Sequence, residues 1–254
     1  MTKMKQVQCW GCLWLALGGY VHADAPAFDR PGIAFSPATL GAGTFTWEQG
    51  LPDVSHDNSP GMHSTLYSAD TLLRAGLASN LEIQLGTALF NRLDTQTPAG
   101  HEHTNGAGDS SLALKVRVPA TAQDFSSAVL ARVSFATGDD AFTAGDRQYG
   151  LGTALAWSLS EAMSAGLYLN ATHLSGQNSY TVSPNFNVAL TETVGAYVEA
   201  ATTQTGHAGR NSVAGAGVSW MVTPATQLDF SADWGLASQR GNYQVGFGVS
   251  EFFN

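Results

Sequence analysis

Apolar and polar residues alternate along the segment from Thr226 to Leu236, TQLDFSADWGL. Every second position from Leu228 to Leu236 is apolar, whereas the positions between them include Asp229 and Asp233. Successive side chains of a β-strand point to opposite faces, so the pattern predicts a strand with one apolar and one acidic face. The apolar face of such a strand points into the core of a soluble sheet, but outward into lipid in a membrane barrel.

The same alternation recurs along most of the chain and predicts about twelve strands. Their lengths are close to the 9 to 11 residues that a tilted membrane strand needs. The expected strands cover residues 43–51, 66–77, 81–89, 111–118, 125–137, 149–159, 163–172, 180–190, 194–204, 212–222, 226–236 and 243–253.

The connections between these strands alternate between long and short. The long ones are Pro52 to Ser64, Asp94 to Ala107, Gly138 to Arg147, His173 to Ser179, Thr205 to Asn211 and Ala237 to Asn242. The short ones centre on Ser79-Asn80, Thr121 to Asp124, Ser160 to Ala162, Thr191 to Thr193 and Thr223 to Ala225. Outer-membrane barrels have short periplasmic turns and longer extracellular loops. We therefore expect an all-β, transmembrane, up-and-down antiparallel β-barrel with both termini on the short-turn side.

The polar parity holds ionisable residues among many Gly, Ala and Ser residues, which is typical of a confined, wet lumen. Besides Asp70 and Glu82, it carries eight candidates for a lumen constriction: Arg74, Lys115, Arg117, Arg132, Glu48, Glu199, Asp229 and Asp233. The basic candidates come from strands two, four and five, and the acidic ones from strands nine, eleven and one. This order predicts a basic wall facing an acidic wall, with a transverse field across the passage. The alternative, left open, is that these charges pair and plug the lumen.

Aromatic residues on the outward parity lie mostly toward strand ends, as an interfacial belt requires. They are Trp47, Tyr149, Trp157, Trp220, Trp234, Tyr243 and Phe253.

The start of the chain has the pattern of a secretory signal peptide. Lys3 and Lys5 precede an apolar run from Cys9 to Val21, and Val21 and Ala23 form a small-residue cleavage site. We expect a signal peptide over residues 1–23 and a barrel domain over residues 24–254, with both cysteines in the peptide. The exported product carries 9 basic and 20 acidic residues, or 9 − 20 = −11, which argues against a nucleic-acid partner.

The residues do not predict a catalytic, metal or cofactor site. His101 and His103 could share a strand face, with His56 and His63 in another long connection, but no third strand-placed ligand is evident. Asp139, Asp140 and Asp146 could bind divalent cations, although a solvated loop is the simpler interpretation. An outer-membrane hydrolase and a soluble periplasmic ligand-binding barrel remain alternatives. The first lacks a G-x-S-x-G motif, and the second requires an apolar interior.

An ordered series of short segments resembles the MetA-pathway of phenol degradation family of outer-membrane transporters. The segments include TLLRAGLASNLEIQLG, GAGDSSLALKVRV, VSFATGDD, LGTALAWSLSEAMSAGLYLN and AGAGVSWMVTPATQLDFSADWGL. The resemblance implies passive uptake of small solutes, among them aromatic or hydrophobic compounds, through the outer membrane of a Gram-negative bacterium. The expected partners are the lipid bilayer, lipopolysaccharide, the outer-membrane assembly machinery and a small-molecule solute.

Overall fold

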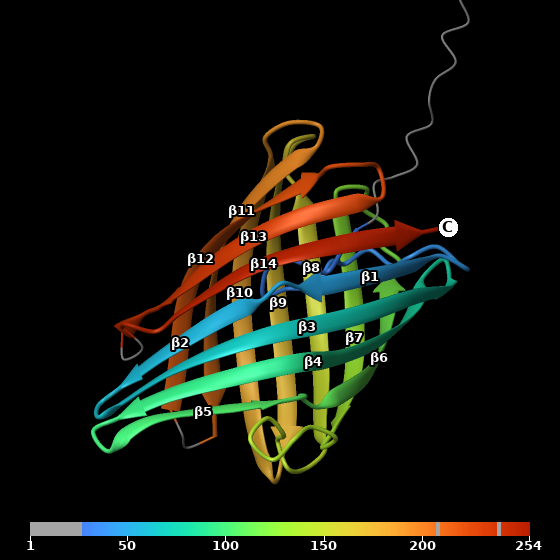
Figure 1. The fold of residues 1–254 in the computed structure, drawn as a ribbon. Helices are drawn as coiled ribbons and strands as arrows, with labels where there is room; N and C mark the ends of the chain where they lie inside the picture. The colour runs from blue at the N-terminus through green and yellow to red at the C-terminus, as the bar shows by residue number, and fades with distance from the viewer. Residues whose placement is uncertain (1–26, 207–208, 238–239) are drawn as a thin grey trace, which may run out of the picture.

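The computed structural model describes residues 27–206, 209–237 and 240–254, which form one closed antiparallel sheet (Figure 1). Within these residues, no helix has the length and apolar character needed to cross a bilayer. The strands are β1 (Phe45–Gly50), β2 (Asp53–Ser59), β3 (Met62–Ala78), β4 (Leu81–Thr97), β5 (Gly100–Gly106), β6 (Ser110–Val118), β7 (Phe125–Phe135), β8 (Gln148–Ser158), β9 (Met163–Leu174), β10 (Gln177–Ala189), β11 (Val194–Thr205), β12 (Gly209–Met221), β13 (Thr226–Gly235) and β14 (Tyr243–Phe253).

The fourteen strand segments of the described chain make twelve barrel strands. β1 and β2 both pair with β3 and with β14, so they are two halves of one strand interrupted at Leu51-Pro52. Proline has no N–H to donate to a ladder, which accounts for an interruption at this point. β5 and β6 both pair with β4 and form a second interrupted strand. The pairing of β1 with β14 closes the sheet, so the predicted up-and-down barrel of about twelve strands is confirmed.

The barrel has a polar interior and an apolar exterior. The largest fully buried side chains are polar or charged and include Arg74, Lys115, Glu48 and Glu82. Exposed apolar side chains cover the outer wall, for example Leu114, Leu151, Phe230 and Trp234. A soluble barrel would have the reverse arrangement, so the soluble periplasmic alternative is wrong. The apolar parity of the strands faces lipid, as the alternation predicts.

Outward aromatic residues form two belts at opposite ends of the barrel. Tyr149 and Trp157 lie near the two ends of β8 and are 52% and 37% exposed. Their separation of eight residues corresponds to roughly 26 Å along the strand, which approaches the height of an outer-membrane apolar band. Tyr243 and Trp234 are cross-strand partners in the belt with Tyr149, whereas Trp47, Trp220 and Phe253 join Trp157 at the other end.

Four of the connections predicted to be long loops are mainly strand. Residues 53–59 and 62–64 belong to β2 and β3, and Gly61, with φ 79°, occupies the tight turn between them. β4 and β5 extend through most of Asp94 to Ala107, and β9 to β12 similarly occupy parts of His173 to Ser179 and Thr205 to Asn211. Both faces of a hairpin that projects beyond the bilayer meet water, so these segments carry no apolar alternation to reveal them. The connection predicted from Gly138 to Arg147 is a loop, and it begins at residue 136 because β7 ends at Phe135.

Candidate functional site: a lumen crossed by the N-terminal segment

Residues 27–44, here called the lumen segment, lie inside the barrel before the chain enters β1. Their backbone N–H groups bond to wall carboxylates: Ile33 donates to Glu199 at 3.1 Å and Leu40 donates to Glu82 at 2.9 Å. These acceptors belong to β11 and β4, on different sides of the barrel. The lumen segment therefore crosses the passage rather than following one wall.

An ion cluster joins the lumen segment to β1, β3, β4 and β6. Arg74 lies 2.7 Å from Glu48 and 2.7 Å from Glu82, and Lys115 lies 2.8 Å from Asp29. The four wall side chains are fully buried and Asp29 is 7% exposed. Removing any one charge from such a site leaves its partners uncompensated in a place with little water, so the cluster acts as a unit.

The charge of Asp29 is stabilised where it sits. Burial alone would raise the pKa of Asp29, but the charges of Arg74 and Lys115, with hydrogen bonds from Lys115 and Gln84, lower it below its ordinary value. Because the folded pKa lies below the unfolded one, the stability from this carboxylate is present above about pH 4 and is lost as the pH falls through the lowered pKa. The anchor therefore persists throughout the neutral range.

A second ion cluster holds Arg30 against a neighbouring part of the wall, formed by β2 and β13. Both terminal nitrogens of Arg30 lie 3.0 Å from oxygens of Asp53, and one lies 3.3 Å from Asp229. Gly248 on β14 allows this approach, because a Cβ at that position would collide with Nε of Arg30. The backbone carbonyl of Arg30 also accepts a hydrogen bond from Gln227 at 3.1 Å.

An apolar contact anchors the far side of the lumen segment. Phe35 packs on a small buried cluster of β6, β7 and β8 that includes Ala128, Leu130 and Ala154. Its ring meets Tyr168 edge to face at 5.5 Å between centroids. Gly152 leaves room for this packing, since a Cβ there would lie 3.0 Å from Phe35. The lumen segment is thus held by charges on one side and by an aromatic ring on the other.

The structure brings five of the eight predicted constriction residues to the lumen segment. Glu48, Arg74 and Lys115 belong to the first ion cluster, Asp229 contacts Arg30, and Glu199 binds the backbone of Ile33. Arg117, Arg132 and Asp233 form no ion pair within the described part of the chain. The expected separation into a basic and an acidic wall is wrong for the clustered residues, because Glu48 and Glu82 lie on the strands that flank Arg74 and pair with it.

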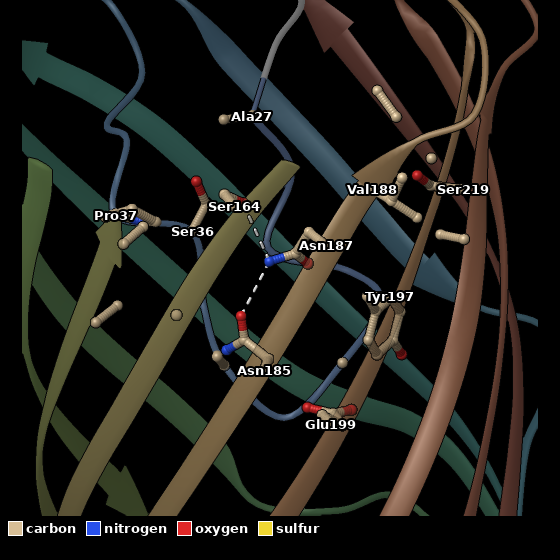
Figure 2. Close-up of a pocket in the computed structure, with 18 of the residues that line it drawn as sticks. Ala27, Ser36, Pro37, Ser164, Asn185, Asn187, Val188, Tyr197, Glu199 and Ser219 are labelled. Atoms are coloured by element: carbon tan, nitrogen blue, oxygen red, sulfur yellow. Dashed lines mark hydrogen bonds between the residues drawn. The ribbon is translucent and has the colours of Figure 1, made fainter. Parts of the chain in front are cut away.

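A cavity of about 640 Å³ lies between the lumen segment and the wall at the short-turn end of the barrel. Figure 2 shows Asn185 and Asn187 of β10 facing it beside Tyr197 and Glu199 of β11. Asn187 donates hydrogen bonds to Asn185 at 3.0 Å and to Ser164 at 3.4 Å, which orders the amides along this wall. We call this space the short-turn cavity.

A second cavity, of about 600 Å³, lies at the opposite end, and we call it the hairpin cavity. The loop 136–147 folds over it: Asp109 accepts hydrogen bonds from the N–H groups of Gly138 at 2.9 Å and Ala144 at 2.8 Å. Asp139 accepts a bond from the N–H of Ala107 at 2.7 Å, so its carboxylate holds the loop. Among the described residues, no group of three or more His, Cys, Asp or Glu is arranged to hold a metal ion.

The sequence interpretation missed the lumen segment altogether. Asp29, Arg30 and Phe35 carry its main contacts, but the stretch FDRPGIAF has no strand alternation and precedes the first expected strand. One signal was available: an adjacent acid and base among apolar residues is unusual for a solvated linker. Asp53, the partner of Arg30, was expected in a loop and lies at the start of β2.

A family model described as "Putative MetA-pathway of phenol degradation" matches residues 28–251. The chain belongs to this family. The matched range begins in the lumen segment and reaches into every strand, ending within β14, so the family pattern extends over both the segment and the barrel that holds it. No curated protein sequence matches the chain.

Solved structures share the barrel of this family member at low sequence identity. An outer-membrane channel from Pseudomonas putida F1 matches with a TM-score of 0.68 and 17% identity, covering 88% of this chain and 99% of that chain. The KdgM porin in complex with disordered oligogalacturonate has a TM-score of 0.56 and 8% identity, with 83% and 99% covered. The β domain of the Bordetella autotransporter BrkA has a TM-score of 0.52 and 15% identity, with 83% and 100% covered. The fold is therefore that of outer-membrane barrels.

The histidines that raised the metal and hydrolase questions lie away from both cavities. His56 is in β2 and His63 in β3, and their rings stack 6.5 Å apart. His101 and His103 are in β5, on the projecting hairpin rather than in a loop. None of the histidines in the described ranges lines the short-turn or the hairpin cavity.

Proposed function

We propose that this family member is a non-catalytic channel for passive uptake of small solutes across the outer membrane of a Gram-negative bacterium. One observation carries the proposal: two cavities enter a polar lumen from opposite ends, and the lumen segment lies between them. The segment is held by ion pairs, hydrogen bonds and one aromatic contact, which are non-covalent contacts that a shift of the segment would break. A shift of the segment would join the two cavities into a continuous path.

The solutes that we propose are small and include aromatic or hydrophobic compounds, on the basis of the family description. The lumen itself favours solutes with a dipole or positive charge. The two ion clusters contain five carboxylates and three cations, or 3 − 5 = −2, counting Asp29, Glu48, Asp53, Glu82, Asp229, Arg30, Arg74 and Lys115. An excess negative charge in a narrow, poorly screened passage attracts cations and opposes anions.

The same proposal includes the route to the membrane and the surroundings of the barrel. Residues 1–23, which lie outside the described residues, would act as the signal peptide. The outer-membrane assembly machinery would insert the closed barrel into the membrane. Lipopolysaccharide would surround the projecting hairpins.

A transverse field remains part of the proposal for two charges that the clusters leave free. Arg132 is on β7 and Asp233 is on β13, the fifth and eleventh of twelve barrel strands, so they lie on opposite sides of the lumen. Each should act on a passing ion according to its sign. Arg132 should repel cations, whereas Asp233 should attract them.

Planar-bilayer recording of refolded protein tests both the channel and the field. Wild type should give discrete currents that favour K⁺ over Cl⁻. Arg132→Ala should increase that preference and Asp233→Ala should decrease it, and the double variant should show the sum of the two shifts in reversal potential. Unchanged ion selectivity in all three variants would contradict the transverse field. The absence of any current from wild-type protein would contradict the channel function.

A further inference from the structure

The hairpin cavity has acidic walls without a matching cation. Three carboxylates line it, those of Asp53, Asp70 and Asp109, and its lining contains no Lys or Arg. Asp53 is neutralised by Arg30, and Asp109 is engaged by the backbone of the loop 136–147. Asp70 accepts one hydrogen bond from the Ser68 hydroxyl at 2.7 Å and forms no ion pair with the described residues. Asp70 therefore presents to the cavity a negative charge that no ion pair neutralises, although the more distant Arg30 partly offsets it.

A second polar group in the cavity also lacks a partner. Asn91 on β4 lines the cavity and is only 4% exposed, yet its side-chain amide makes no hydrogen bond to any residue in the described ranges. The polar atoms of this amide are open to the cavity, where water or a polar group of a ligand can pair with them. An unpaired amide at 4% exposure, in a space that also holds a free carboxylate, indicates a place for a polar ligand group.

The remaining surface of the cavity is apolar. Leu66 and Leu93 are cross-strand partners on β3 and β4, and Phe142 of the loop 136–147 lines the same space. A volume of about 600 Å³ lies within the range of small-molecule sites. An inorganic cation would use the carboxylate but leave this apolar surface uncovered. An anion would be repelled, since no positive side chain is available in the lining to receive it.

We propose that the hairpin cavity binds a small protonated amine with an apolar body, such as an arylalkylammonium ion. Its ammonium group donates hydrogen bonds to the Asp70 carboxylate and to the side-chain oxygen of Asn91. Its apolar body covers the two leucines and Phe142. The role of such binding in uptake rests on the proposed channel function, as the first site that a solute meets at the hairpin end, but the binding itself requires no current.

Calorimetric titration of the refolded protein in detergent, at neutral pH and constant salt, tests the site. The probes are phenethylammonium, neutral phenethyl alcohol and anionic phenylacetate. Phenethylammonium should bind, and the other two should bind at least tenfold more weakly. Asp70→Asn preserves shape and removes the charge, so it should weaken phenethylammonium binding at least tenfold. Asp124→Asn, an exposed carboxylate in the short turn before β7, should leave the affinity within twofold of wild type.

Several results would overturn the amine site. They are equal binding of the alcohol or the anion, equal effects of Asp70→Asn and Asp124→Asn, and displacement of phenethylammonium by an equal concentration of K⁺, which would indicate an inorganic cation site. A shift in mobility on heating before electrophoresis verifies that each variant is folded. Binding of phenethylammonium without bilayer current would support the amine site and contradict the channel function. Bilayer current without binding would support the channel function and contradict the amine site.

Discussion

Replacing Arg74 by Met is expected to lower the free energy of unfolding by about 3 to 5 kcal/mol, because it removes the positive charge from a buried cluster. Arg74 is fully buried and contacts Glu48, Glu82 and Asp29, so the variant leaves three carboxylates with only Lys115 for compensation. Methionine keeps most of the side-chain length, which limits the effect of lost packing. Urea unfolding of the refolded protein in detergent, followed by tryptophan fluorescence, measures the change.

Arg92 supplies the matched control for that experiment. It pairs with Asp94 at 3.0 Å on the projecting hairpin, where the two side chains are 48% and 37% exposed. Exposed pairs contribute about 0 to 1 kcal/mol, so Arg92→Met should change the unfolding free energy by no more than that. Equal destabilisation by the two substitutions would show that the buried cluster has no special role in holding the barrel together.

The second large effect is expected on conductance. Deleting residues 27–40 removes most of the lumen segment, including Asp29, Arg30 and Phe35, while leaving Arg74 paired with Glu48 and Glu82 on the wall. The mean single-channel conductance should rise on the order of tenfold, because a twelve-stranded barrel without an internal segment has a continuous aqueous path. Planar-bilayer recording in the same salt as wild type gives the comparison.

Phe35→Ala provides an intermediate variant with the segment still present. It removes the apolar anchor against Tyr168 and Leu130 but keeps both ion clusters, so its currents should flicker between the wild-type level and a higher one. If the deletion variant folds and conducts no better than wild type, the lumen segment does not close the passage. In that case the loop 136–147 at the hairpin end becomes the barrier to examine.

The strands, with their apolar side chains outward and their polar side chains inward, could be predicted because the bilayer imposes a strict pattern of alternation. Leu228, Phe230 and Trp234 must face lipid, whereas Asp229 and Asp233 must not. Apolar and polar residues therefore alternate along the strand. The projecting parts of β2 to β5 follow no such rule, since water lies on both of their faces. Residues there, such as His56 and His103, were consequently expected in loops.

The site was harder to predict than the fold. The alternation of inward and outward positions placed Arg74, Lys115 and Glu48 in the lumen. It gives no information on their positions along the barrel axis or on which of them form ion pairs. Their pairing follows from the register between neighbouring strands and from Asp29, which reaches them from outside the strand pattern. The lumen segment has no periodicity, because its contacts are made one residue at a time to different walls. Only the three-dimensional arrangement reveals it.

The most direct test of the account is a cysteine scan along β13 in proteoliposomes, using a chain that starts at residue 24 and so lacks both native cysteines. Single cysteines at positions 228 to 234 would be treated with a small charged thiol reagent. In a separate experiment they would be labelled with a fluorescent dye whose emission is quenched by a quencher attached to the lipid acyl chains. The account predicts reaction with the reagent at 229, 231 and 233 and lipid quenching at 228, 230, 232 and 234. The reverse alternation, or uniform labelling at all seven positions, would contradict an inside-out barrel.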